Sequence, residues 1–462
     1  MDGLNCREIT LKEALANKDK RIDSQFWTTC ISKNTRYTYS KIGNILLSSQ
    51  YGMSVDLNTE GIGYPIFRMN EMHNMLTDLE VEKYANVSNI EYQIFSLNNK
   101  DVLFNRTNSY EWVGRTGIYY KNDNTPFTYA SYLVRFVPDN SVILPEYLTA
   151  FLNTSIGVKA IKARARQSVN QTNVNPEEVK EIEIPLLTME FQKIIEGMFL
   201  TANKQRVVAR SLYNEVLRQL EQCINISVDI ARNAYTEKML SDSFNVSGRL
   251  DAEYYQPKYE QIETAIKNTK HTYLDVICDV DSGEFISETL YGQEGFSYIR
   301  GTDITSHCID VENATKVNTT INGLNVIENG DLAFAMIGSV GNVSINRGTT
   351  AIVSNNLGTI KPHDKKLSNY LLVYLLSDIG QALFEKYQTR TAQPKIKKED
   401  VGKFLVPLLS DDEIEFISNK AEESFRLKEK SKELLDIAIK AVEMAIETDE
   451  DSALLWLEIQ KL

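Results

Sequence analysis

Two long stretches of this chain carry apolar residues at the spacing of an amphipathic helix. In the first, apolar side chains recur at helical spacing, at Phe191, Ile194, Ile195, Met198, Ala202, Val208, Leu212, Val216, Leu217 and Leu220. Thr188 is a suitable residue to begin this helix, and Glu190 follows in its first turn. A helix from Thr188 to about Cys223 has roughly 36 residues and a length of about 54 Å. Because one globular core needs less, we interpret it as a strut.

The second stretch begins at Ser410 and repeats the first. A shift of 222 residues aligns VKEIEIPLLT (179–188) with VGKFLVPLLS (401–410) and places Pro185 on Pro407. An apolar run, a proline that ends it, a helix cap and a long helix therefore occur twice in the same order.

Other segments repeat as well, which indicates an internal duplication. The sequence RIDSQFW (21–27) matches RLDAEYY (249–255), and we interpret this motif as structural, with the arginine and aspartate fixing a turn while the aromatic residues pack. Residues 65–72, 99–104 and 144–157 correspond to residues 297–304, 329–334 and 367–380. The last pair has the pattern of a short buried helix.

Residues 39–140 are predicted to be rich in β-strands. Short apolar runs alternate there with Gly, Asn and Asp. The runs are Tyr64–Met69, Tyr92–Ser96, Val102–Asn105, Gly117–Tyr120 and Ser131–Val137. A short amphipathic piece at Leu11–Ala16 precedes them.

Each half has a polar, basic loop between its short helix and its long helix. These loops are KARARQSVNQTN (162–173) and KYQTRTAQPKIKK (386–398). Arg and Lys contact phosphates, whereas Arg, Gln and Asn pair with the edges of bases. A third loop, NRTNSYEWVGR (105–115), follows a predicted strand and mixes the same groups with aromatic residues, while its counterpart AMIGSVGNV (335–343) is smaller and neutral. The alternative interpretation is that these are ordinary solvated surface loops.

The residues that we expect to contact DNA come from these loops and from one arginine at the same place in each half. In the first half they are Arg68, Asn105, Arg106, Thr107, Asn108, Arg115, Lys162, Arg164, Arg166, Gln167, Asn170 and Gln171. In the second half they are Arg300, Ser339, Asn342, Lys386, Gln388, Arg390, Gln393, Lys395 and Lys397.

The net charge of −13 argues against a nucleic-acid partner, but its distribution does not. Residues 406–462 hold 15 acidic and 7 basic side chains. Residues 100–175 hold 9 basic and 5 acidic side chains, and residues 381–403 hold 6 basic and 3 acidic ones. The acidic charge therefore belongs to the second strut and the basic charge to the regions that precede the struts.

Signatures of catalysis, metal binding and membrane insertion are missing from the 462 residues. The chain has no P-loop, no strand-linked Gly-x-Gly-x-x-Gly and no Asn/Asp-Pro-Pro-Tyr/Phe tetrapeptide. Its four histidines are scattered, and its five cysteines form no Cys-x-x-Cys pair. There is no secretory signal and no apolar run of membrane-spanning length. We expect a non-catalytic, cytoplasmic protein with reduced, structural thiols.

Taken together, the motifs resemble those of the specificity (S) subunits of type I restriction–modification systems. The residues that carry the resemblance are DVLFNRTN (101–108), Val113 with Gly114, YLVRF (132–136), QSVNQT (167–172), IEIP (182–185) and RLDAEYYQP (249–257). The likeness covers residues 20–447 and includes the duplication. This sequence departs from the family pattern at GSVGN (338–342), which replaces the Asn-Arg-Thr-Asn form, and at Phe191-Gln192, where Glu-Gln is common.

The resemblance implies an α+β fold with two tandem target-recognition domains, each followed by a long helix. The two helices would pack as an antiparallel coiled-coil spacer between two half-sites of double-stranded DNA. Such subunits bind two methyltransferase (M) subunits and, through them, restriction (R) subunits. They contain no cofactor site of their own, so AdoMet and ATP with Mg²⁺ are expected in the partners.

The expected organisation has five parts. Residues 1–187 form the first target-recognition domain, 188–226 the central spacer helix, 227–409 the second domain, 410–447 the distal spacer helix and 448–462 a C-terminal tail. Two alternatives remain open: a duplicated scaffold that binds protein, and a DNA-modifying enzyme subunit whose site is not recognisable.

Overall fold

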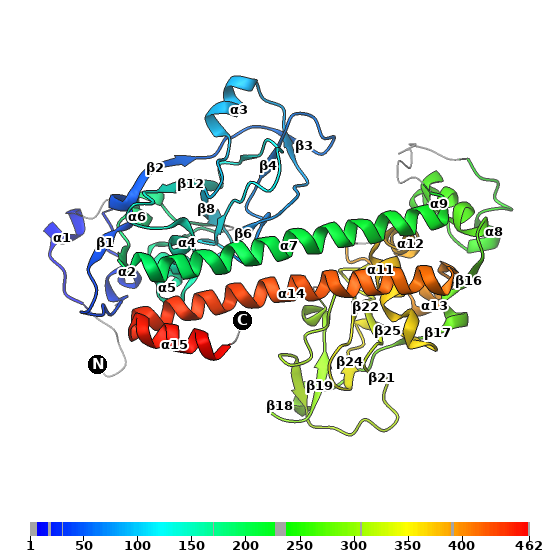
Figure 1. Ribbon diagram of the computed structural model, residues 1–462. Coiled ribbons are helices and arrows are strands. Elements are labelled where there is room, and N and C mark those ends of the chain that lie inside the picture. Colours follow the sequence, from blue (N-terminus) through cyan, green and yellow to red (C-terminus); the bar gives the residue numbers. More distant parts are fainter. Residues whose placement is uncertain are drawn as a thin grey trace. The chain divides into compact units, whose positions relative to one another are not determined.

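The computed structural model describes residues 7–16, 20–29, 31–169, 171–226, 237–304, 307–389 and 392–460 (Figure 1). The chain divides into two compact units. Unit 1 contains residues 1–208 and 427–462, and unit 2 contains residues 209–426. The two predicted long helices are confirmed as α7 (Met189–Ile224) and α14 (Asp411–Glu447). Each of them contributes one part to each unit.

A six-stranded sheet lies at the centre of unit 1, in the order β2-β12-β8-β10-β6-β5. The strands are β2 (Leu46–Tyr51), β12 (Leu133–Pro138), β8 (Val102–Asn105), β10 (Thr116–Ile118), β6 (Leu76–Thr77) and β5 (Met72–His73). Helix α4 (Pro145–Asn153) packs on β10 and β12, and α5 (Ser155–Arg164) packs on α4. A second sheet consists of β11 (Thr128–Tyr129), β4 (Tyr64–Phe67), β7 (Tyr84–Ala85) and β3 (Leu57–Asn58).

Unit 2 has the same plan. Its main sheet has the order β17-β25-β22-β23, and its second sheet has the order β18-β20-β19-β24-β21. The strands are β17 (Cys278–Ser282), β25 (Leu357–Pro362), β22 (Leu332–Ala335), β23 (Val343–Ile345), β18 (Tyr291–Gly292), β20 (Thr315–Val317), β19 (Phe296–Ile299), β24 (Ala351–Val353) and β21 (Val326–Ile327). Helices α11 (Ser368–Leu376) and α12 (Asp378–Tyr387) correspond to α4 and α5.

Small details of structure repeat between the units and confirm the duplication. In both, a buried tyrosine hydroxyl donates to the carbonyl of the proline before the long helix: Tyr147 to Pro185 at 2.8 Å and Tyr370 to Pro407 at 2.7 Å. These prolines end β15 (Glu183–Pro185) and β26 (Leu405–Pro407), which pair with β1 (Tyr39–Lys41) and β16 (His271–Tyr273). The repeated sequence therefore builds the same entry into each long helix.

The Arg-x-Asp-aromatic motif is structural, as predicted. Arg21 donates to both carboxylate oxygens of Asp23, at 2.6 and 2.9 Å, and its guanidinium lies over the ring of Phe26. Arg249 forms the same bidentate pair with Asp251 and lies over Tyr254. The pairs close a turn before the first strand of each half.

The long helices pack against each other in antiparallel fashion within each unit. In unit 1, Ser431 Oγ donates to the carbonyl of Ala202 at 2.8 Å, and in unit 2, Ser424 Oγ donates to that of Ala209 at 2.6 Å. Both bonds are buried, and small residues at these positions allow the backbones to approach. Of the apolar residues that suggested the helix stripe, Ile194 and Val208 are instead partly exposed, at 36% and 40%.

The predicted strand at Tyr92–Ser96 is wrong. Residues Asn89–Phe95 form helix α3. Ser88 and Glu91 make a complete capping box, in which each side chain bonds to the backbone of the other residue. This local signal outweighs the β-propensity of the aromatic and branched residues. The other four predicted strands overlap β4, β8, β10 and β12.

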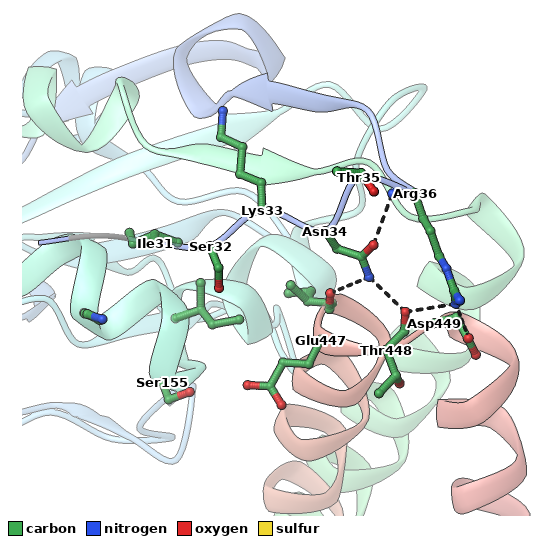
Figure 2. A pocket seen from close by; sticks show the side chains of 13 residues that line it. Ile31, Ser32, Lys33, Asn34, Thr35, Arg36, Ser155, Glu447, Thr448 and Asp449 are labelled. Atoms are coloured by element: carbon green, nitrogen blue, oxygen red, sulfur yellow. Dashed lines mark hydrogen bonds and ion pairs between the residues drawn. The ribbon is translucent and has the colours of Figure 1, made fainter.

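Residues 31–37 of unit 1 are tied to the end of α14 (Figure 2). Asn34 Nδ2 donates to the carbonyls of Ile446 and Thr448, at 3.1 and 2.8 Å, and Arg36 forms an ion pair with Asp449. A pocket of about 890 Å³ lies between this segment, α5 and the end of α14. At the corresponding place in the chain, unit 2 has helix α9 (Pro257–Lys267) instead. Helix α15 (Glu450–Gln460) follows α14.

Replacing Asn34 with alanine is expected to lower the free energy of unfolding of unit 1 by about 1–2 kcal/mol, because the side chain bonds two carbonyls at a helix end. The three tryptophans, Trp27, Trp112 and Trp456, all lie in unit 1, so urea unfolding followed by their fluorescence measures this unit. The control is Thr35→Ala, which truncates an exposed neighbour. Equal effects of both substitutions would contradict the capping role.

A charged cluster around the buried carboxylate of Glu146 joins the sheet of unit 1 to α7. The Lys100 ammonium contacts Glu146, which is fully buried, at 2.9 Å, and also forms an ion pair with Glu196 on α7. The hydroxyl of Tyr120 donates to Glu146 at 2.9 Å. Burial disfavours the charge on Lys100, but hydrogen bonds to Glu196 and Glu146 prevail and raise its pKa. The lysine is therefore charged at neutral pH.

Candidate nucleic-acid interface

The fold of unit 1 places two of the predicted loops side by side. Strand β9 (Thr107–Asn108) belongs to the loop at 105–115. Strands β13 (Arg166–Gln167) and β14 (Thr172–Asn173) belong to the loop at 162–173. They form a three-stranded sheet in the order β13-β14-β9, in which Thr172 lies opposite Asn108 and Asn173 opposite Thr107. Thr107 Oγ1 also donates to Asn173 Oδ1 at 2.6 Å. We call this sheet and its connecting turns the paired loops of unit 1.

Among the predicted contact residues in the paired loops, the exposed ones are Arg166, Gln167 and Gln171, and Asn108 is half-buried. By contrast, Asn105 and Thr107 are buried. Asn105 Oδ1 accepts from the backbone amide of Thr107 at 3.2 Å, which shapes the start of the loop. The exposed set therefore consists of one guanidinium and two amides, the groups that suit direct contact with base edges. Asn170 lies outside the described residues.

Lys162 and Arg164 hold the paired loops of unit 1 and the helices beside them through hydrogen bonds to backbone carbonyls. The Lys162 ammonium donates to the carbonyls of Tyr110, Glu111 and Val113, the latter two at 3.1 and 2.9 Å. Arg164 donates to the carbonyls of Glu178 and Ala160, both at 2.9 Å. Burial lowers the pKa of both side chains. Their hydrogen bonds hold the backbone of the loops and of the helices beside them.

Arg106 and Arg115 lie against aromatic rings. The guanidinium of Arg106 is 5.2 Å from the ring centre of Tyr51 and donates weakly to the Ser131 carbonyl at 3.5 Å. That of Arg115 is 3.3 Å from the ring centre of Trp112. Burial lowers the pKa of Arg115, and Glu111 opposes this change.

Two exposed aromatic residues at this place, Tyr51 and Tyr132, were missed by the sequence reasoning. They are 46% and 43% exposed. Tyr51 is the last residue of β2. It lies opposite Val134 of β12, and Val134 comes two residues after Tyr132 in the chain. Tyr132 also accepts the backbone amide of Arg106 at its carbonyl, at 3.0 Å. No local pattern marks these tyrosines, because strand pairing between distant segments brings them to Arg106.

Unit 2 pairs the corresponding loops in the same way. Lys395 bridges to both Ile337 and Thr389 in antiparallel fashion, and Gly338 N donates to the Pro394 carbonyl at 2.9 Å. We call these segments the paired loops of unit 2. Their exposed candidates are Ser339, Asn342, Gln393, Lys395 and Lys397.

Two other candidates of unit 2 take part in internal contacts. Lys386 is buried and forms an ion pair with Glu263 of α9. The carbonyl of Gln388 accepts from Arg249 at 3.0 Å. Arg390 lies outside the described residues.

Arg68 and Arg300 occupy equivalent positions, as the sequence alignment predicts, but in the second sheet of each unit. Each follows a strand, β4 or β19, that pairs in parallel with a later one. Arg68 pairs with Glu71 and Glu82; burial disfavours its charge, but the carboxylates prevail and raise its pKa. Arg300 is exposed. The main-sheet loops and these arginines therefore come from different sheets.

In the part of the chain that the structure describes, no three His, Cys, Asp or Glu side chains are grouped so that they could hold a metal ion. The same residues include no helix that is long and apolar enough to cross a membrane.

Comparison with known proteins gives consistent matches over both halves. Residues 34–201 and 268–417 match the family described as "Type I restriction modification DNA specificity domain". The chain is 24% identical over 419 residues to a putative type I restriction enzyme MjaX specificity subunit of Methanocaldococcus jannaschii, covering 87% of this chain and 90% of that protein. It is 26% identical over 138 residues to the EcoKI specificity subunit of Escherichia coli, covering 30% of each.

Among solved structures, the chain resembles a type I restriction–modification system S subunit from M. genitalium, with a TM-score of 0.41 and 13% identity over 92% of this chain and 97% of that one. The family match takes in more than half of the chain and recurs in each of the two halves that the duplication defines. The chain therefore belongs to the type I restriction–modification DNA specificity family, and its function is DNA recognition in such a system.

Proposed function

We propose that this chain reads a bipartite target in double-stranded DNA, with the paired loops of unit 1 at one half-site and those of unit 2 at the other. The observation that carries the proposal is the repeated pairing of two polar loops beside the main sheet of each unit. In both units, exposed side chains with donor and acceptor groups gather where these loops meet.

The two sets of exposed residues differ in chemistry, which supports different half-site sequences. Unit 1 presents Arg166, Gln167 and Gln171, and unit 2 presents Ser339, Asn342, Gln393, Lys395 and Lys397. Gln and Asn pair with adenine, and Arg and Lys contact both guanine and phosphate. We propose that the six candidates with internal roles, Asn105, Thr107, Lys162, Arg164, Lys386 and Gln388, position these readers.

We further propose that α7 and α14 set the distance between the half-sites. A helix of 36 residues is about 54 Å long, which corresponds to at most about 16 base pairs. With its net negative charge, the chain alone should bind DNA weakly. Two M subunits and, through them, R subunits would supply further phosphate contacts, the AdoMet and ATP–Mg²⁺ sites and the chemistry. The proposed place of action is the cytoplasm, with the DNA.

The test begins by mapping the methylated adenines made by the complete complex, because the motif reveals both half-sites and their spacing. Replacing Gln167 and Gln171 with alanine is then expected to relax or change the half-site read by unit 1 only. Each lost bidentate contact should reduce discrimination by about 1–3 kcal/mol. Methylation profiles of random-sequence DNA measure both half-sites at once.

The matched control is Gln93→Ala, which removes an exposed amide from α3, outside the paired loops. It should leave both half-sites unchanged. Equal relaxation of both half-sites by the double substitution would contradict the assignment of one half-site to each unit. A wild-type complex without sequence preference would contradict the proposed function itself and favour a protein-binding scaffold.

A further inference from the structure

The loop at 105–114 of unit 1 is longer than its counterpart at 335–341 of unit 2. Both loops begin at the end of equivalent strands, at Asn105 and Ala335. Both end at a glycine with positive φ, Gly114 at +91° and Gly341 at +100°. A serine and a valine are shared as well, as NRTNSYEWVG (105–114) and AMIGSVG (335–341) show. The three additional residues of unit 1 are Tyr110, Glu111 and Trp112.

Hydrogen bonds and close packing hold the turn that carries this insertion. Trp112 N and Val113 N both donate to the Ser109 carbonyl, at 3.1 and 2.9 Å, which closes a tight turn. Val113 is buried, and a Cβ on Gly114 would lie 2.5 Å from the Ile161 side chain. The three carbonyl contacts of Lys162 hold the turn from below. The turn therefore keeps its shape without help from a ligand.

The side chains of the insertion point away from the core. Tyr110 and Trp112 are 41% and 42% exposed, and Glu111 is exposed as well. The guanidinium of Arg115 stacks on the indole of Trp112 at 3.3 Å from the ring centre, which restricts its rotation. Lys162 and Arg115 lie near Glu111 and balance its charge. Two large rings of the turn at 109–114 are thus partly exposed to solvent.

The exposed part of Trp112 contributes less to the stability of the fold than a buried tryptophan would, because a buried indole gains more free energy from the hydrophobic effect. Unit 2 closes the same turn with Ser339 and Val340 and no aromatic residue. Stacking on a nucleic-acid base uses an exposed, pre-oriented ring, and a flat ring that enters the base stack opens the step that it enters.

We infer that Trp112, with one face of its indole covered by Arg115, stacks its free face on a base and opens one base step in the half-site read by unit 1. The inference rests on the proposed function, since it needs unit 1 to bind DNA through its paired loops. It adds an asymmetry: the half-site read by unit 2 is bound without such a step.

The test uses the full chain assembled with its M subunits and duplexes that carry 2-aminopurine in place of single adenines. Opening a step unstacks this base and raises its fluorescence. The wild-type complex should raise it at a step in the unit 1 half-site. Trp112→Ala should abolish that rise and weaken binding roughly 5- to 150-fold, the range for one stacked base. Trp112→Phe should retain part of both.

Two controls separate this signal from others. An adenine that a methyltransferase flips out gives a signal in either half-site that does not depend on Trp112. Gln93→Ala, on α3 and outside the paired loops, should leave the unit 1 signal unchanged.

The inference is overturned if Trp112→Ala keeps the signal and the affinity, or if the wild-type complex binds its target without a Trp112-dependent signal. It is also overturned if Trp112→Ala prevents assembly with the M subunits, because Trp112 would then contact an M subunit and not DNA. A wild-type complex that does not select its target contradicts the proposed function instead, which is a distinct result.

Discussion

Lengthening α7 and α14 together by one heptad should widen the gap between the half-sites of the target and leave the half-sites themselves unchanged. The structure offers a suitable place, because the Ser431–Ala202 and Ser424–Ala209 hydrogen bonds are seven residues apart on both helices. Duplicating residues 202–208 and residues 424–430 repeats this unit and preserves the contacts within units 1 and 2. Seven residues add about 10.5 Å, which spans at most about three base pairs.

The measurement is the methylated-adenine motif of the lengthened complex, which gives the new gap directly. Affinity for the original target should fall at least 100-fold, because the two half-sites can no longer be contacted together. A duplication in α7 alone moves the facing residues out of register and serves as the control, since it should abolish recognition of either gap. An unchanged gap in the doubly lengthened protein would contradict the spacer role of the helices.

Replacing Lys100 with methionine is expected to lower the free energy of unfolding of unit 1 by about 3–5 kcal/mol. The substitution leaves the carboxylate of Glu146 buried without its counter-charge, and Glu196 on α7 loses its partner. The Oε2 atom of Glu146 already has no hydrogen-bond partner. Urea unfolding followed by tryptophan fluorescence measures the loss. Because the pKa of Lys100 is raised, its contribution is complete at neutral pH and disappears only in strong alkali.

Unit 2 supplies the matched control for this cluster. Gly330 and Asn369 stand there at the positions of Lys100 and Glu146. Gly330 has the same left-handed conformation as Lys100, with φ of 88° and 72°. The double substitution Lys100→Gly with Glu146→Asn removes both charges and the backbone strain, so it should cost far less than Lys100→Met. If the double variant were as unstable as the single one, the unpaired carboxylate would not be the cause.

The paired loops show how far sequence reasoning reaches. The loops themselves were predicted, because Arg, Lys, Gln and Asn gather between two apolar elements. Their contact across about 65 residues was not predicted, since it depends on the pairing of β9 with β14. Which side chains face outward was not predicted either. Lys162 and Arg164 have the same composition signal as Arg166, yet their donors are taken by carbonyls of the turn at 110–113 and of α5 and α6 (Pro176–Lys180).

The sequence by itself determined the duplication, the two long helices and the repeated entry into each helix. These features follow from hydrophobic spacing, helix caps and prolines. Such signals act over a few residues and do not depend on contacts between distant parts of the chain. The misjudgement at Tyr92–Ser96 arose where a capping box competed with β-propensity. Only the tertiary structure decided the roles of the charged residues in the predicted DNA-contacting loops. A long cationic side chain binds whichever acceptors the fold presents, and for Lys162 and Lys386 these come from residues far away in the chain.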